Sequence, residues 1–157
     1  MKKLIIKISK VAKAIKDMAC PPATKDVGLN TKNRNATREN HMYGPLNVNE
    51  PGDYWLKLAE KWKTTEKAAK KSTCGVCVAF DISPRMDECM PGPVSDESGR
   101  LGYCWMHHFK CHSARSCDTW AMGGPIKDDK KSIQWQEKNK KGNSCLKIGG
   151  SSLMKSV

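Results

Sequence analysis

Eight cysteines occur in the 157-residue chain, and six of them fall in one stretch between residues 74 and 117. Their order is Cys74-x2-Cys77-x11-Cys89-x14-Cys104-x6-Cys111-x5-Cys117. A Cys-x2-Cys turn places two thiolates on one side of a tight loop, where they can bind one metal ion or part of an iron–sulfur cluster. We therefore expect a folded module organised around a metal ion, an iron–sulfur cluster or disulfides.

Zinc and disulfides are two of the three chemistries open to these cysteines. A paired-knuckle zinc site needs a second Cys-x2-Cys, which this sequence lacks. His108-x3-His112 has the spacing of the second half of a zinc finger, but about thirty residues separate it from Cys77, roughly twice the usual interval. The clustered cysteines, together with Cys20 and Cys145, also allow many disulfide pairings, and spacing alone does not choose among them.

An iron–sulfur cluster is the third chemistry, and the neighbouring residues suit it. Such a cluster needs four thiolates, an apolar shell that limits the access of water, and backbone amides directed at sulfur. Several aromatic residues that could form the shell lie beside the cysteines, namely Phe80, Tyr103, Trp105 and Trp120. Histidines 107, 108 and 112 are expected at the surface or beside the ligands, because six cysteines leave no shortage of thiolates.

Three short motifs resemble the high-potential iron–sulfur proteins. They are Cys74-Gly-Val-Cys77-Val-Ala-Phe80, Cys89-Met-Pro-Gly92 and Gly102-Tyr103-Cys104, which lie within residues 74–104. The resemblance implies a small irregular fold wrapped around a 4Fe–4S cluster, with four cysteine ligands: Cys74, Cys77, Cys89 and Cys104.

A second ligand set is nearly as good. The family has an aromatic residue three positions after its last ligand, and this feature is absent at His107 but present in Cys117-Asp-Thr-Trp120. The second set is therefore Cys74, Cys77, Cys104 and Cys117, with residues 89–100 as an inserted loop and Cys111 as a further competitor. More distantly, residues 52–125 resemble uncharacterised structural proteins of tailed phages of aquatic bacteria.

The net charge of +12 is unevenly distributed along the chain. Basic minus acidic residues give 16 − 7 for residues 1–73, 4 − 5 for residues 74–117 and 8 − 4 for residues 118–157. Basic segments outside a neutral module suit an anionic partner such as nucleic acid, a phospholipid surface or an acidic protein face. They also simply favour solubility in a chain that is only 38% hydrophobic.

The chain divides into four expected parts. Residues 1–19 form a cationic amphipathic helix that docks on other protein chains, and residues 20–52, rich in Pro, Gly, Asn and Thr, form an extended linker. Residues 53–125 hold a tryptophan-bearing helix over residues 54–71, capped by Asp53, and then the cysteine module. Residues 126–157 form a basic, polar C-terminal arm with a short helix around Ile133 and Trp135.

The expected fold class is a small, irregular, cysteine-rich domain, stabilised by a metal or cluster, with a few short helices and strands and with extended arms at either side. Lysines interrupt the apolar N-terminal segment, so we expect no signal peptide and no transmembrane segment. Synthesis in the reducing cytoplasm would favour metal over disulfides, and a virion is a further expected location.

The functional expectation is an accessory structural protein of a large assembly, such as a phage virion, whose 4Fe–4S cluster acts as a structural staple. Three alternatives stay open at this point: a soluble one-electron carrier, a zinc-dependent nucleic-acid-binding protein, and a metal-free protein stapled by disulfides. We do not expect an enzyme, because no acidic residue can be picked out to orient a Cys/His pair and reactive thiols rarely crowd together in this way.

Overall fold

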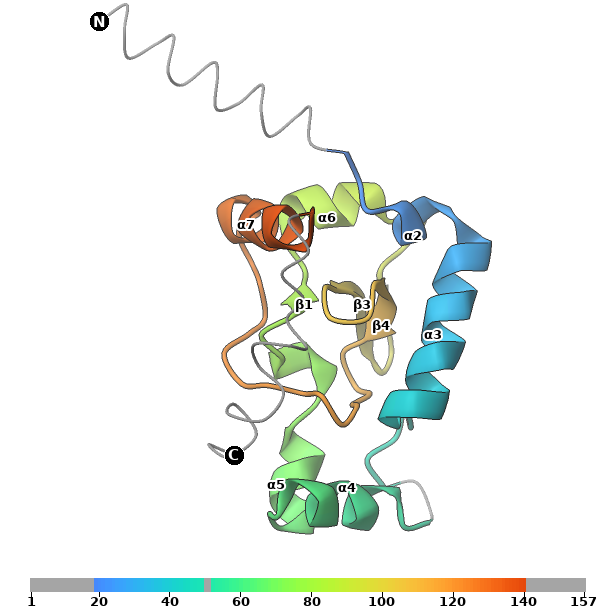
Figure 1. The fold of residues 1–157 in the computed structure, drawn as a ribbon, viewed down its shortest axis with the longest axis vertical. Helices are drawn as coiled ribbons and strands as arrows, with labels where there is room; N and C mark the ends of the chain where they lie inside the picture. The colour runs from blue at the N-terminus through green and yellow to red at the C-terminus, as the bar shows by residue number, and fades with distance from the viewer. Residues whose placement is uncertain (1–18, 50–51, 141–157) are drawn as a thin grey trace, which may run out of the picture.

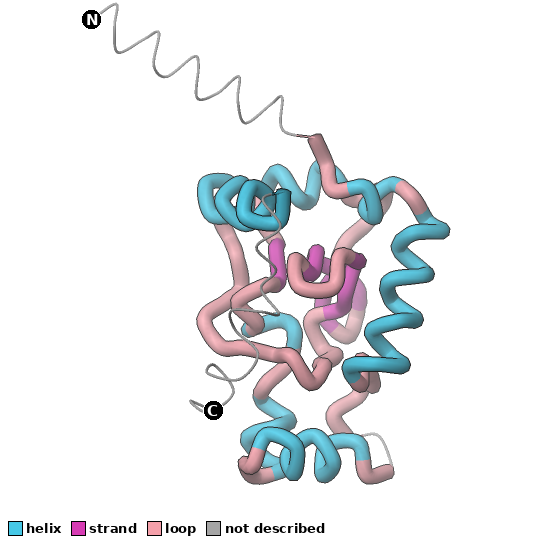
Figure 2. The backbone as a smooth tube through the Cα atoms, viewed as in Figure 1, coloured by secondary structure: helices cyan, strands magenta, loops and turns pink. Residues whose placement is uncertain are grey.

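The computed structural model describes residues 19–49 and 52–140. A small sheet lies at the centre, with helices around it (Figures 1 and 2). The helices are α2 (Pro22–Lys25), α3 (Val27–His41), α4 (Tyr54–Trp62), α5 (Glu66–Lys71), η1 (Cys74–Val76), α6 (Pro84–Cys89) and α7 (Asp129–Lys140). The strands are β1 (Phe80–Asp81), β2 (Ser95–Asp96), β3 (Gly99–Cys104) and β4 (Phe109–His112). The prediction of a small domain with a few short helices and strands is therefore confirmed.

Strand β3 is the centre of the sheet, because all three other strands pair with it in antiparallel fashion. Residues directly opposite each other in such a pair point to the same face. Phe80 of β1 and Phe109 of β4 both lie opposite Cys104, so these three side chains share one face of the sheet. Asp81 lies opposite Tyr103, so these two occupy the other face.

The segment expected to be an extended linker is largely helical, so that prediction was wrong for residues 22–41. Helix α3 begins after Asp26, whose side chain accepts a hydrogen bond from Leu29 N, and ends where Met42 adopts a left-handed conformation. Its docking depends on polar groups: Asn30 accepts a hydrogen bond from Lys110 N, and Asn33 donates to His108 O. Such a helix lacks the apolar periodicity from which helices are predicted in a sequence.

The predicted tryptophan-bearing helix over residues 54–71 is present as two helices. Lys63 ends α4 in a left-handed conformation, and the side chain of Thr65 then caps α5 by accepting a hydrogen bond from Ala68 N. The apolar stripe is confirmed, because Trp55, Leu58, Ala59 and Trp62 are all buried. Trp62 Nε1 donates to Asp118 O at 2.9 Å, which places this helix against the cysteine module as expected.

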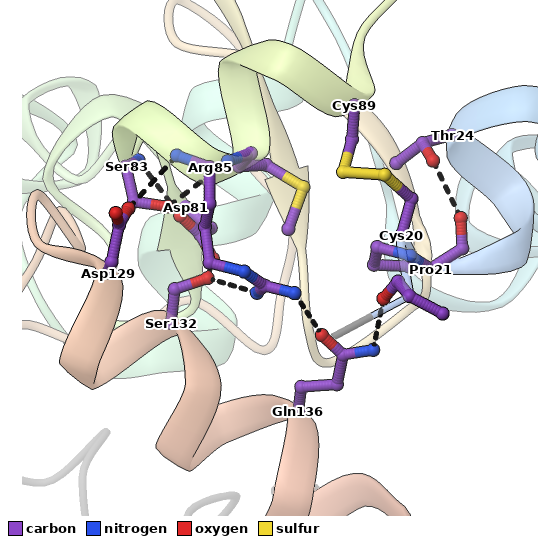
Figure 3. Close-up of a disulfide and its surroundings, with 12 residues drawn as sticks. Cys20, Pro21, Thr24, Asp81, Ser83, Arg85, Cys89, Asp129, Ser132 and Gln136 are labelled. Atoms are coloured by element: carbon purple, nitrogen blue, oxygen red, sulfur yellow. Dashed lines mark hydrogen bonds between the residues drawn. A yellow bond between two sulfur atoms is a disulfide. The ribbon is translucent and has the colours of Figure 1, made fainter. Parts of the chain in front are cut away.

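The predicted short helix around Ile133 and Trp135 is confirmed as α7, and it lies beside α6 at one end of the domain (Figure 1). The buried residues of α7 are the polar Ser132 and Gln136, and Trp135 is partly buried against the core. Arg85 donates to Ser132 Oγ at 2.7 Å and to Gln136 Oε1 at 2.6 Å, and Ser132 in turn donates to Asp81 (Figure 3). The described part of the expected C-terminal arm is therefore packed on the domain.

Two predicted features lie outside the described residues. These are the amphipathic helix of residues 1–19, apart from residue 19 itself, and the end of the C-terminal arm after residue 140. Among the residues that the structure describes, no helix has the length and apolar character needed to cross a membrane.

Candidate metal centre

Five buried cysteines carry free thiols, and they come from three separate segments of the described chain. Cys74 and Cys77 bracket the short helix η1, Cys104 and Cys111 belong to the β3–β4 hairpin, and Cys117 follows that hairpin. We call these five side chains the thiol cluster. Five of the six cysteines that cluster in the sequence therefore also lie near one another in the fold.

Backbone contacts fix the Cys74–Cys77 turn on the segment that follows β4. Cys77 N donates to Cys74 O at 2.9 Å, which closes the turn, and Cys74 N donates to Arg115 O at 2.7 Å. Gly75 N donates to Ser113 O at 2.9 Å. A Cβ atom at position 75 would lie 3.2 Å from Ser113 O, so glycine permits this close approach.

The hairpin presents its two thiols on one face. Cys104 lies opposite Phe109 and Cys111 lies opposite Gly102, so all four positions share a face of the sheet. Phe80 covers the same face, because a Cβ atom on Gly102 would overlap its ring. Phe80 therefore borders the thiols, as expected for an apolar shell.

The other predicted shell residues divide between two places. Trp120 stays with the thiol cluster, since its backbone N donates to Cys117 O and its Nε1 donates to Thr73 O beside η1. Tyr103 and Trp105 are buried but form a T-shaped pair, and Trp105 Nε1 donates to Asp81 Oδ2 on the opposite face of the sheet. They pack towards the network of α6 and α7 instead.

The thiols interact with one another. Burial, followed by the neighbouring Cys104 and Cys74 thiols, raises the pKa of Cys111. The Cys111 thiol, followed by the backbone amides of His107 and Met106, lowers the pKa of Cys104 against the opposing effect of its burial. A thiolate that accepts amide hydrogen bonds is stabilised in its ligand-ready form, and such bonds are typical of metal-bound cysteines.

Burial has the opposite effect on other members of the thiol cluster. It raises the pKa of Cys77 to about 12, with contributions from the neighbouring Cys74 and Cys104. The backbone amides of Ala121 and Ala79 point at the Cys77 sulfur and partly offset this shift. Crowded, buried thiols stay protonated in the metal-free protein unless a cation neutralises the thiolates, and a metal ion supplies that charge.

A chain of polar groups leads away from Cys117. Its Sγ lies 3.3 Å from Thr119 Oγ1, and that hydroxyl lies 2.6 Å from His107 Nε2. Burial lowers the pKa of His107 to about 4, with a smaller effect from the nearby His41. The expectation that a histidine lies beside the cysteines without being a ligand fits this position of His107.

Asp118 is an acidic residue at this site that sequence reasoning missed. It is 4% exposed, and its carboxylate lies 3.1 Å from His41 Nδ1 and 2.5 Å from Lys61 Nζ. His41 stacks on His107 with ring centroids 4.5 Å apart. The position directly after Cys117 was the only sequence signal for Asp118, since its partners lie more than fifty residues away in the chain.

A disulfide removes Cys89 from the candidate ligands in this structure. Cys20 and Cys89 are joined, which ties the chain before α2 to the last residue of α6 (Figure 3). The ligand set that includes Cys89 is therefore not assembled here, whereas Cys74, Cys77, Cys104 and Cys117 remain together as free thiols. Cys145 lies outside the described residues.

Within residues 19–49 and 52–140, no three or more His, Cys, Asp or Glu side chains form a group able to hold a single metal ion. Donor chemistry and the directed amides suit a thiolate-bound centre, but the sulfurs are not gathered on one point. Comparison with known proteins gives no further guide, because no family model, no curated protein and no solved structure matches this chain.

Proposed function

We propose that the thiol cluster binds a metal centre, with a 4Fe–4S cluster as the first candidate, and that this centre staples the module of an accessory structural protein. The observation that carries the proposal is the meeting of five buried free thiols from η1, the β3–β4 hairpin and the segment after it. A centre bound there would cross-link three segments that are far apart in the sequence.

Cys74, Cys77, Cys104 and Cys117 are the four ligands that we propose. Disulfide bonding removes Cys89 from competition, and Cys111 is the fifth thiol. When bound, the cluster supplies four Fe–S(Cys) bonds, one to each iron, so its ligands need not converge on one point as they do around zinc. The amides directed at Cys77 and Cys104 and the ring of Phe80 supply the remaining elements of such a site.

A structural metal centre would stabilise this chain, which contains few hydrophobic residues. Only 38% of its residues are hydrophobic, and part of the described interior is held by polar contacts such as those of Arg85. The free energy of metal binding becomes folding free energy when the unfolded chain has no preformed site. The basic composition outside residues 74–117 supports a docking role on a large assembly, such as a virion, separate from the metal centre.

The metal proposal is tested by purifying the full chain without oxygen and measuring iron, sulfide, zinc and the visible absorption spectrum. About four irons and four sulfides per chain are expected. One zinc per chain with no visible absorption would replace the cluster by a zinc site, and a colourless, metal-free protein would contradict the proposal. Detection of the protein in purified virions by mass spectrometry tests the assembly role, and its absence from the particles would remove that role.

Ligand assignment needs matched cysteine variants. Cys117→Ser is expected to lose the cluster, whereas Cys111→Ser is expected to keep the iron content and spectrum of the unaltered chain. Cys145→Ser serves as a control for removing a thiol elsewhere in the sequence. If the results for positions 111 and 117 are reversed, Cys111 is the fourth ligand and the assignment of Cys117 is wrong.

One observation favours electron transfer as a second candidate function. Val76, inside the Cys74–Cys77 turn, is 45% exposed. Met122, which forms an isolated antiparallel β-bridge with Cys77, is 46% exposed. A thiol site directly beneath an exposed apolar surface would give a redox partner close access. Reversible one-electron reduction of the loaded protein supports the carrier, whereas a redox-silent cluster leaves the staple alone.

A further inference from the structure

A basic groove of about 1220 Å³ lies on the side of the domain where α3, the loop after it and the start of α4 meet β4. It does not include any cysteine of the thiol cluster. Its charged lining residues are Arg34, Arg38, Glu39, Asp53, Lys57, Asp96, Lys110, His112 and Arg115. The groove is therefore a site distinct from the proposed metal centre.

Two of the three acidic groups in the groove have a neighbouring partner, a lysine for one and a histidine for the other. Asp53 pairs with Lys57 at 3.1 Å, and Asp96 pairs with His112 at 2.9 Å. Only Glu39 then remains as a lining carboxylate without a basic partner in the described part of the chain. Together with Asp96, whose histidine partner carries no fixed charge, it stands against four cations.

These four cations, Arg34, Arg38, Lys110 and Arg115, pair with no carboxylate among the described residues. Arg34 and Arg38 are four positions apart on α3 and so lie on one face of that helix. Lys110 extends from β4, where its backbone N is held by Asn30. Arg115 lies over the ring of Tyr43, 5.6 Å from its centroid, so positive groups stand on more than one wall of the groove.

We propose that this groove binds the sugar–phosphate backbone of single-stranded nucleic acid without sequence preference. Three of the four uncompensated cations are arginines, whose guanidinium groups match phosphate oxygens in a two-pronged geometry. A concave, positively charged groove that follows the backbone is the usual way in which proteins hold a single strand. The half-buried side chains of Met42, Leu46 and Leu101 in the lining can pack against the sugars.

Other anionic partners suit the groove less well. The buried centre of a protein interface is typically apolar, and stable binding to a membrane surface typically adds inserted apolar side chains to electrostatic attraction. The large hydrophobic residues that are exposed in the described chain, Val27, Leu56, Val76 and Met122, all lie outside the groove. A strand with one charge per nucleotide makes no such demand, and its bases can remain in solvent.

The test is binding of a fluorescein-labelled oligothymidylate to the full chain, followed by anisotropy over a range of salt concentrations. Four neutralised phosphates predict a slope of about −3 in a plot of log affinity against log salt for a single strand. The groove variant Arg34→Gln/Arg38→Gln/Lys110→Gln should weaken binding at least tenfold and bring the slope about 2 nearer to zero.

The control variant Lys67→Gln/Lys71→Gln/Lys130→Gln removes the same charge from exposed positions outside the groove. It should lower the affinity at most threefold. Equal losses in both variants would show that bulk charge carries the binding, and the proposal would be overturned. Iron content and thermal unfolding of both variants should match the unaltered chain, and Arg34→Glu alone serves as a second groove variant if the triple variant is unstable.

Three competing ligands complete the experiment. A duplex of the same length that binds more tightly than the single strand would overturn the assignment to single strands. Preferential, groove-dependent binding to vesicles containing phosphatidylglycerol, or to polyglutamate, would overturn nucleic acid as the partner. None of these results depends on the thiol cluster, so the two proposals can fail separately.

Discussion

Removing the Cys20–Cys89 disulfide should destabilise the domain by an amount that follows from its position. The bond closes a loop of 69 residues, which contains α2 to α6. For a loop of that length the chain-entropy relation gives about 15 cal/mol/K, or about 4 kcal/mol at 25 °C. Strain and residual structure in the unfolded chain usually reduce this value, so we expect a loss of about 2–4 kcal/mol.

The folded state should change little when the disulfide is absent. Cys20 follows Ala19, whose carbonyl accepts a hydrogen bond from Gln136 Nε2 at 2.7 Å, and Pro21 and Thr24 beside it are buried (Figure 3). These contacts hold the start of the described chain with or without the disulfide. The expected loss therefore arises from the greater freedom of the unfolded chain.

Urea unfolding of the non-reduced protein measures this loss. The variant Cys20→Ala/Cys89→Ala removes both sulfurs, so that no partner is left to mispair. Dithiothreitol should lower the unfolding midpoint of the unaltered chain to that of the variant, and should leave the variant where it is. Cys145→Ala should behave like the unaltered chain. Equal free energies of unfolding for the variant and the non-reduced unaltered chain would falsify the reasoning.

Two further predictions concern packing. Gly124→Ala would make a Cβ atom overlap the backbone carbonyl of Cys77. We expect this variant to lose about 1–3 kcal/mol of its free energy of unfolding, measured in urea, and to bind less metal. Gly28→Ala on α3 meets nothing closer than 3.4 Å and should leave both measurements nearly unchanged. Arg85→Met should cost about 1–3 kcal/mol, because it leaves acceptors such as Ser132 Oγ without their buried donor, and thermal unfolding with no change would contradict this role.

Elements with an apolar pattern could be predicted from the sequence. Trp55, Leu58 and Trp62 recur at helical spacing, and their stripe is buried against the cysteine module. The broken helix after Trp62 was missed because a lysine in a left-handed conformation leaves no clear mark in the sequence. The gathering of cysteines in one place also followed from their spacing, since six of them lie within one short stretch.

Contacts that join distant polar residues could not be predicted. Helix α3 is held by Asn30 and Asn33, residue types that are more typical of turns and linkers, and their partners lie 80 and 75 positions away. The pairing of Cys20 with Cys89 was one of many possibilities until the chain path was known. Likewise, the division of the aromatic residues between two faces depended on the register of β1 with β3.

The hydrogen bond from Gln136 to Ala19 brings the two ends of the described domain together. Lys140 lies only four residues beyond Gln136 on α7, a distance of about 6 Å along a helix axis. The basic segments 1–18 and 141–157 are therefore attached at neighbouring points of the domain. A partner that bound one segment would be held at high effective concentration near the other, so two weak contacts could act as one bivalent interaction. Release would then require both contacts to open at once, and affinity would depend more than additively on the two segments.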